Sequence, residues 1–99
     1  MSAITAVNLV KFVKTKIPKW EKLTTMAQGK EFKVEIVGAG GDAIEVTPGS
    51  GTARRIGPAE IARICKKYNA TQSLSPGDYQ QESQNASYLL TLIGLCLDE

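Results

Sequence analysis

Hydrophobic residues recur every three or four positions in three segments of the chain, and each of these segments predicts a helix. In the first, residues 4–17, the valines Val7, Val10 and Val13 form a stripe, while lysines occupy the opposite side. Proline disfavours helical geometry at the residue before it, so we expect this helix to end or kink at Pro18.

The second helix is predicted to begin at Pro58. Gly57-Pro58 marks the start because proline fits the first helical position, where its missing N–H costs nothing. Lys66 and Lys67 then lie near the expected C-terminal end, which Asn69 would cap. Four residues at positions i, i+3, i+4 and i+7 share the face that should be buried: Ile61, Ile64, Cys65 and Tyr68.

The third helix is expected from Ala86 to about Leu97, with Ser83 or Asn85 as its N-cap. Its apolar residues occupy nearly every side, and a helix of that kind is buried on every side. In a chain of 99 residues this predicts either a central position in the core or a subunit interface.

Strict alternation of apolar and polar residues predicts strands in the middle of the chain. Glu31 to Val37 alternates, a loop of five residues follows at 38–42, and Ala43 to Thr47 alternates again. The pair is typical of an antiparallel β-hairpin, and Thr52 to Ile56 is a possible third strand.

Two shorter stretches are less regular. Pro18 could open a short helix that turns Trp20 and Leu23 inward and ends at Gly29. The polar segment from Thr71 to Gln84 should hold a turn, or one helical turn, at Ser75-Pro76-Gly77-Asp78.

These elements predict a single α+β domain over residues 1–99, with an N-terminal helix, an antiparallel β-hairpin or three-stranded sheet, and two C-terminal helices. A small β-barrel is the alternative, disfavoured because only two strands are clear. The expected core consists of strand and helix residues that face inward: Phe32, Val34, Ile36, Ile44, Val46, Ile61, Ile64, Leu89, Leu92 and Ile93.

The net charge of +2 is small, but its distribution along the chain is uneven. Residues 1–30 hold six lysines against Glu21, and residues 52–67 hold five basic residues against Glu60. If folding brings these two blocks together, they would form a surface for nucleic acid. The candidate residues for nucleic-acid binding are Arg54, Arg55, Arg63, Lys66, Lys67, Lys11 and Lys14, with Lys16, Lys19 and Lys22 in the same first block. The alternative is that they form only the polar sides of two amphipathic helices.

Residues suited to catalysis or metal binding are scarce. The chain has no histidine, its carboxylates are scattered, and its serines lack a nucleophile motif, so we expect no enzyme activity, no cofactor and no metal site. Cys65 and Cys96 lie in apolar helical patterns, which favours buried thiols in a reducing compartment. The glycine-rich loop at 38–41 is interpreted as a plain hairpin turn. The N-terminus lacks a signal-peptide pattern and no apolar run is long enough for a membrane span, so a cytoplasmic protein is expected.

The C-terminal half resembles a small α+β module attached to some microbial restriction-type and mobile-element proteins. The resemblance is carried by Gly51-Thr52-Ala53-Arg54-Arg55-Ile56, the following helix, the polar loop, and Asn85-Ala86-Ser87-Tyr88-Leu89-Leu90. It implies an association with DNA. The catalytic segments of such proteins are missing, so no nuclease activity is implied.

Together these features predict a non-enzymatic small binding module, associated with nucleic acid through a basic surface. The alternative is a structural or assembly subunit, a homo-oligomer that self-associates through the last helix. Leu90 and Leu97 are the expected self-association residues, because a small core has little left to cover them.

Overall fold

The computed structural model describes residues 3–17, 21–25, 29–49, 51–79 and 85–98. In these ranges the chain forms an α+β fold, as the sequence predicts. The elements in chain order are α1 (Ala6–Lys16), β1 (Leu23–Thr24), β2 (Glu31–Val37), β3 (Ala43–Pro48), β4 (Arg54–Ile56), α2 (Pro58–Thr71), the 3₁₀ helix η1 (Pro76–Tyr79) and α3 (Ala86–Leu97).

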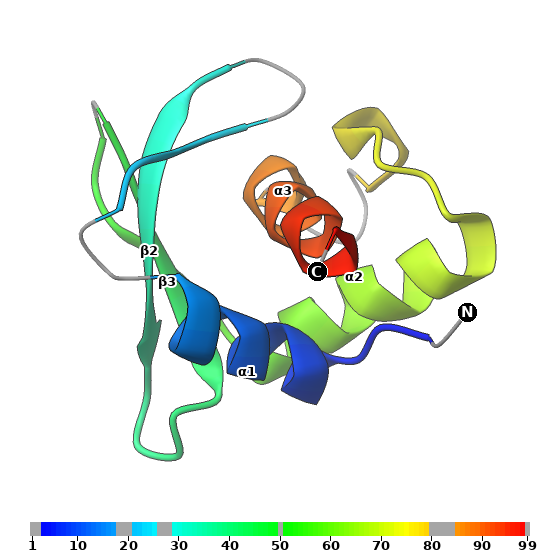
Figure 1. Ribbon diagram of the computed structural model, residues 1–99, viewed down its shortest axis with the longest axis horizontal. Coiled ribbons are helices and arrows are strands. Elements are labelled where there is room, and N and C mark those ends of the chain that lie inside the picture. Colours follow the sequence, from blue (N-terminus) through cyan, green and yellow to red (C-terminus); the bar gives the residue numbers. More distant parts are fainter. Residues whose placement is uncertain (1–2, 18–20, 26–28, 50, 80–84, 99) are drawn as a thin grey trace.

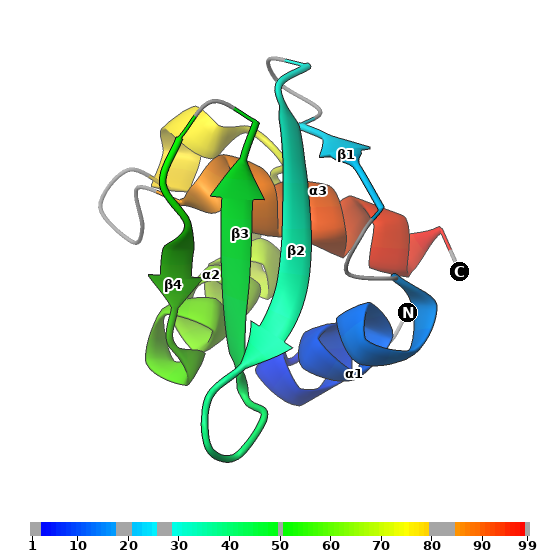
Figure 2. The same ribbon diagram turned by 90° about the vertical axis from the view of Figure 1, so that its left-hand side faces the viewer.

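The strands form one antiparallel sheet in the order β1-β2-β3-β4 (Figure 2). The β2–β3 hairpin is confirmed, with Val34 opposite Val46 and Ile36 opposite Ile44. The possible third strand is also confirmed as β4, in which Ile56 pairs with Ile44. Because side chains alternate across a strand, the apolar positions of β2, β3 and β4 share the face that is buried.

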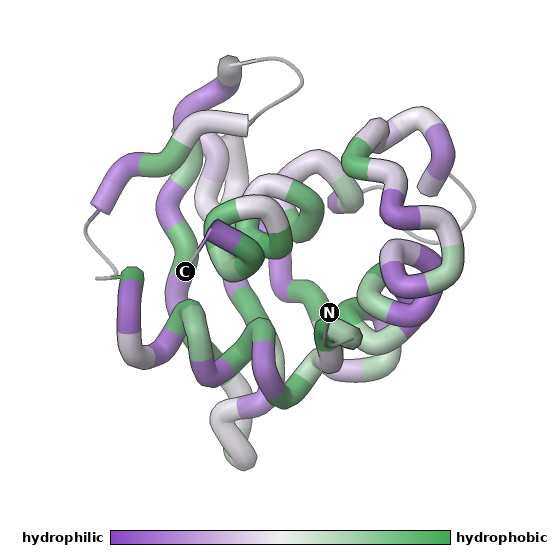
Figure 3. The backbone as a smooth tube through the Cα atoms, turned by 45° about the vertical axis from the view of Figure 1, so that its right-hand side comes forward, coloured by the Kyte–Doolittle hydropathy of each residue, from purple (hydrophilic) through white to green (hydrophobic). Residues whose placement is uncertain are grey.

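All three α-helices lie on that one face of the sheet (Figure 1). The helix α3 lies in the middle, between the sheet and α2, and runs across the strands behind them in Figure 2. Its backbone is coloured green and white over most of its length, whereas the strands alternate between purple and green (Figure 3). The all-round apolar pattern of the last helix therefore corresponds to a central position in the core.

The core contains the residues expected from the sequence. Nine of the ten are buried, and Ile36 is half-buried and packs against the same cluster. Phe32 and Tyr88 join sheet and central helix through an edge-to-face ring contact, with centroids 5.0 Å apart. The core also takes in Tyr79 of η1, whose hydroxyl donates to the carbonyl oxygen of Ser73 at 2.6 Å.

The buried face of α1 differs from the predicted stripe. Val7 is 76% exposed, whereas Leu9, Val10 and Val13 are buried and Ala6 packs against the core. Thr5 caps the helix by accepting a hydrogen bond from the backbone N–H of Asn8 at 3.1 Å. With the face centred between Leu9 and Val13, the helical repeat places Ala6 rather than Val7 on it. The helix ends at Lys16, before Pro18, as expected.

The segment before β2 forms a strand, so the prediction of a short helix ending at Gly29 was wrong for Leu23 and Thr24. Gly29 has a positive φ of 66°, but its N–H donates to the carbonyl oxygen of Thr25 at 2.8 Å, and Thr25 N–H donates to Lys30 O at 2.9 Å. These two hydrogen bonds join Thr25, just after β1, to the residues that lead into β2. Trp20 and Lys19 lie outside the described residues.

The second helix begins at Pro58 with Gly57 as its N-cap, as predicted, but it is longer than expected. It ends at Thr71, and Gln72 takes the left-handed C-cap position with φ 55°. Asn69 is therefore a helical residue and was wrongly assigned as the cap. Its side chain bonds both backbone groups of Ile4, accepting from the N–H at 3.0 Å and donating to the carbonyl at 2.7 Å.

Two further expectations concern helix ends. Lys66 and Lys67 do not lie in the last turn of α2, because the helix continues beyond them. Asn85 holds the N-cap position of α3, and the alternative cap Ser83 lies outside the described residues. The turn expected near Ser75 is present as η1.

Candidate functional site

The loop that joins β2 to β3, residues 38–42, projects beyond α1 and α2 at the lower end of Figures 1 and 2. It is closed by a hydrogen bond from Gly41 N–H to Gly38 O at 3.1 Å. Gly38 and Gly41 have φ values of 97° and 64°, a region that residues with a side chain rarely adopt. The loop therefore holds a defined shape that depends on its glycines.

Two cationic side chains lie against this loop. The Nζ atom of Lys14 is 3.3 Å from the position that a Cβ atom on Gly41 would occupy. An Nη atom of Arg55 is 3.2 Å from the corresponding position on Gly38. Lys14 belongs to α1 and Arg55 to β4, so the loop brings together one residue from each basic block of the sequence.

The two cations approach from opposite faces of the hairpin. Lys14 lies on the helix side, since the same point on Gly41 is 3.9 Å from Ile36, a residue of the inward face. Arg55 pairs with Glu45 on the outward face. The hairpin tip is thus bracketed by one positive charge on each side.

A surface depression of about 420 Å³ lies between α1 and this loop. Lys11 and Lys14 line it together with Gly40 and Gly41, and Asp42 contributes a carboxylate. Val7 and Val10 form its apolar part, and Pro58 brings in the start of α2. Two ammonium groups against one carboxylate leave the depression with a positive balance that suits an anionic ligand.

The side chain of Arg54 does not lie against the hairpin loop. The strand turns its side chain to the opposite face from Arg55, where its Nη1 donates to Oδ1 of Asn85 at 3.4 Å. Asn85 in turn donates from Nδ2 to Oε2 of Glu60 at 3.2 Å. Arg54 therefore belongs to a chain of polar contacts that joins β4, α3 and α2, separate from the loop.

The remaining basic candidates lie on other parts of the surface. Arg63 and Lys66 are exposed on α2. Lys67 is half-buried, with its Nζ 5.5 Å from the centroid of the Tyr79 ring, a cation–π contact that helps to hold η1. Lys16 is exposed near the end of α1, and Lys22 lies beside β1, where it is 3.9 Å from a carboxylate oxygen of Glu31. Lys11 and Lys14 of the first block thus lie on the helix side of the loop and Arg55 of the second block lies on its outward side, so the two blocks reach the same loop from different faces. The sequence signal for this place was the glycine-rich loop, which we had interpreted as a plain turn.

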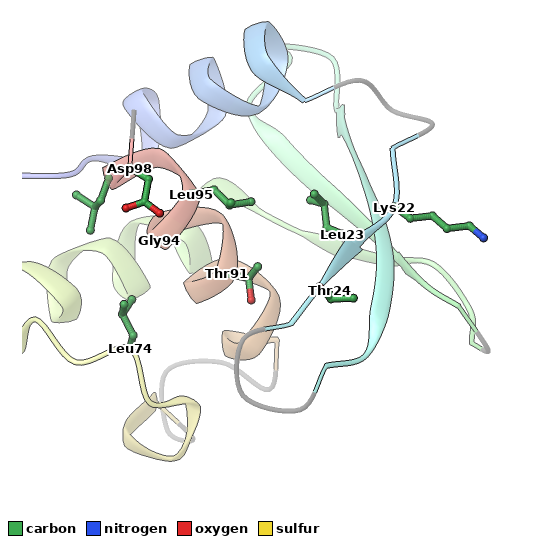
Figure 4. A pocket seen from close by; sticks show the side chains of 9 residues that line it. Lys22, Leu23, Thr24, Leu74, Thr91, Gly94, Leu95 and Asp98 are labelled. Carbon is green, nitrogen blue, oxygen red and sulfur yellow. The ribbon is translucent and has the colours of Figure 1, made fainter.

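A second surface feature is an apolar groove of about 380 Å³ along the C-terminal half of α3 (Figure 4). Its floor is a stripe on α3 at spacings of three and four residues: Thr91, Gly94, Leu95 and Asp98. Leu23 and Thr24 of β1, with Lys22, form one margin, and Leu74 and Leu97 add to the lining. We call this feature the α3 groove.

Three partly exposed leucines line the α3 groove. Leu74 and Leu95 are each 37% exposed and Leu97 is 39% exposed. Leu90, by contrast, is 1% exposed and packs inside the core, contrary to the expectation that it faces outward. Of the two leucines expected at a self-association surface, Leu97 is therefore the one that reaches solvent.

The cysteines are both free thiols. Cys65 is buried on α2, and burial, with a smaller contribution from Cys96, raises its pKa to about 11. A thiol with such a pKa stays protonated at neutral pH and is a poor nucleophile. Within the part of the chain that the structure describes, no three side chains of the metal-ligating types gather into a group, and no helix is long and apolar enough to cross a membrane.

No family model, curated protein or solved structure matches this chain.

Proposed function

We propose that this protein is a non-enzymatic binding module that contacts the phosphates of nucleic acid through Lys11, Lys14 and Arg55. The observation that supports the proposal is the arrangement of these residues around one projecting loop. Lys14 and Arg55 are 41 positions apart in the sequence, yet both reach the glycines of residues 38–42.

Electrostatics favours a polyanion as the ligand. Lysine and arginine bound to phosphates release counterions from nucleic acid, which supplies most of the affinity of sequence-independent binding. The DNA association implied by the resemblance of the C-terminal half remains a prediction and agrees with this proposal. The same proposal includes a cytoplasmic location, where the free thiols Cys65 and Cys96 would stay reduced.

The test is fluorescence anisotropy of the native protein with labelled DNA and RNA over a range of salt concentrations. Three phosphate contacts, at a slope of about 0.9 each, predict a loss of roughly fortyfold in affinity between about 50 and 200 mM salt. Replacing Lys14 and Arg55 together by alanine should flatten this dependence by about two units of slope.

The matched control removes one lysine just before β2 and one in its first half, both away from the loop: Lys30→Ala with Lys33→Ala. This control lowers the net charge by the same amount as the Lys14→Ala and Arg55→Ala double variant. A similar loss of affinity in both double variants would therefore mean that the loop is not the binding site. Absence of binding to either nucleic acid at low salt would refute the proposed function itself.

The α3 groove favours a second candidate function, that of a homo-oligomeric assembly subunit. Leu74, Leu95 and Leu97 are each partly exposed in this one depression, and a second copy seated on the groove would bury them. A two-fold axis through the groove would place the leucines of one copy against those of the other, which is the self-complementary arrangement that a two-fold interface requires.

A further inference from the structure

We propose that the nucleic acid bound at the hairpin loop is a single strand, and that the depression between α1 and this loop holds one of its nucleotides. The proposal rests on the proposed nucleic-acid function. Two properties of the depression support it: a positive charge balance on the helix side of the loop, and an exposed apolar wall beside the lysines.

Beside the loop, the outward face of the sheet carries carboxylates as well as Arg55. Arg55 lies opposite Glu45 in the sheet, and Glu45 lies opposite Glu35. Asp42 is also close, because its Oδ1 atom is 3.4 Å, and Nη2 of Arg55 is 3.2 Å, from the position that a Cβ atom on Gly38 would occupy. These carboxylates offset the charge of Arg55, so the outward side can add one phosphate contact but does not suit a row of phosphates.

The helix side of the loop has a positive balance. Lys11 and Lys14 line the depression there, and Asp42 is the one carboxylate among the described residues that line it. The two lysines are three positions apart on α1, so they are neighbours on its surface, with Cβ atoms about 5–6 Å apart. Two ammonium groups at this spacing suit consecutive phosphates of one strand, with the nucleotide that joins them seated in the depression.

The depression also exposes apolar surface, which phosphates do not require. Val7 is 76% exposed and lines the depression together with Val10 and Pro58. A duplex would present mainly its phosphates and sugars to this wall, because its bases are stacked inside. The bases of a single strand can be splayed out and laid against a protein surface. Because Asp42 reduces the net attraction for phosphate, the apolar contact favours the ligand whose bases are free.

The dimensions of the site favour a single strand as well. A volume of about 420 Å³ lies toward the lower end of the range for small-ligand sites, about 300–1,000 Å³. β2 and β3 are the two central strands of the sheet, and the helices cover its inner face, so a duplex groove cannot surround the hairpin. The loop projects beyond α1, so a stiff duplex would meet the loop before it reached the depression. A flexible strand can follow the surface from the loop to α1.

The experiment measures the anisotropy of three labelled probes with the native protein at low salt, each in DNA and in RNA. The probes are a single strand, a strand of the same length without bases, and a duplex of the same sequence. In the nucleic acid that binds more tightly, we expect the single strand to bind about fivefold or more tightly than the other two. Equal or tighter binding of the baseless strand or of the duplex would overturn the inference and leave the proposed function standing. No binding to any probe would overturn both.

A variant in the apolar wall gives a second test. Binding of single strands usually depends on aromatic rings on which bases stack, and in this depression Val7 occupies the place of such a ring. Val7→Trp should therefore tighten binding of the single strand about fivefold or more and leave the baseless strand unchanged. Thr47→Trp, at an exposed position of β3 away from the loop, is the control. Equal gains in the two variants, or no gain in Val7→Trp with its helical circular dichroism intact, would also overturn the inference.

Discussion

The two neighbouring arginines of β4 have different surroundings, because a strand turns alternate side chains to opposite faces. Arg54 reaches Asn85, while Arg55 lies against Gly38. The sequence shows two adjacent positive charges and predicts one basic surface. Only the register, with Arg55 opposite Glu45 and Arg54 opposite Val46, reveals which of the two faces outward.

The buried thiol of Cys65 should make the free energy of unfolding depend on pH. Its pKa is about 11 in the folded chain, against an ordinary value of 9.0. Below about pH 9 the thiol is protonated in both states, and its contribution to stability is fully present. Between pH 9 and 11 the unfolded chain loses the proton while the folded chain keeps it, so the free energy of unfolding should fall, by about 1–3 kcal/mol.

The measurement is urea unfolding at several pH values under reducing conditions, with Cys65→Ala as the comparison. The two proteins share every other titratable group, so the difference between the two slopes isolates the thiol. Identical slopes would contradict the prediction.

Among the elements, those with a long regular pattern could be predicted from the sequence. The bounds of β2 are those expected, and α2 begins at Pro58, because seven alternating residues and a proline start signal act locally. By contrast, β1 has two residues and exists because β2 pairs with it, which no local pattern records. The predicted end of α2 was wrong because the side chain of Asn69 does not cap the helix. It forms hydrogen bonds with the backbone of Ile4, a residue 65 positions away.

The buried face of α2 gives a prediction at the level of the element. Ile64 is fully buried in the core, so Ile64→Ala should lower the free energy of unfolding by about 2–5 kcal/mol through lost burial and a residual cavity. Val7→Ala, an exposed aliphatic position on α1, should change it by less than about 0.5 kcal/mol. Chemical denaturation of both variants measures the two values, and a similar small change in each would refute the assignment of Ile64 to the core.

At the scale of the whole molecule, the sequence predicted the layers better than the surface. An all-round apolar helix had to be either central or an interface, and the structure places α3 in the centre with only its C-terminal end lining a groove. That Lys14 and Arg55 both lie against the hairpin loop was not predictable, since it depends on how α1 and β4 lie around the hairpin. Where a charged segment of the sequence lies on the surface can be stated only once the order of the strands in the sheet is known.

Self-association through the α3 groove can be distinguished from nucleic-acid binding by its chemistry. Apolar association does not weaken steeply with salt, whereas phosphate contacts do. If the groove pairs two copies, light scattering of the native protein should give a dimeric mass at micromolar concentration, unchanged by salt. Leu97→Glu should reduce that mass to a monomer and keep the helical circular dichroism, because Leu97 is 39% exposed and its replacement leaves the core intact.

Two controls make the dimer prediction specific to the α3 groove. Val7→Glu places the same charge on an exposed aliphatic position of α1 and should leave the dimer unchanged. Leu90→Glu buries a carboxylate in the core and should unfold the chain, because Leu90 is 1% exposed. A monomeric mass for the native protein would refute the homo-oligomer. A dimer that persists in Leu97→Glu would place the interface on another surface of the molecule.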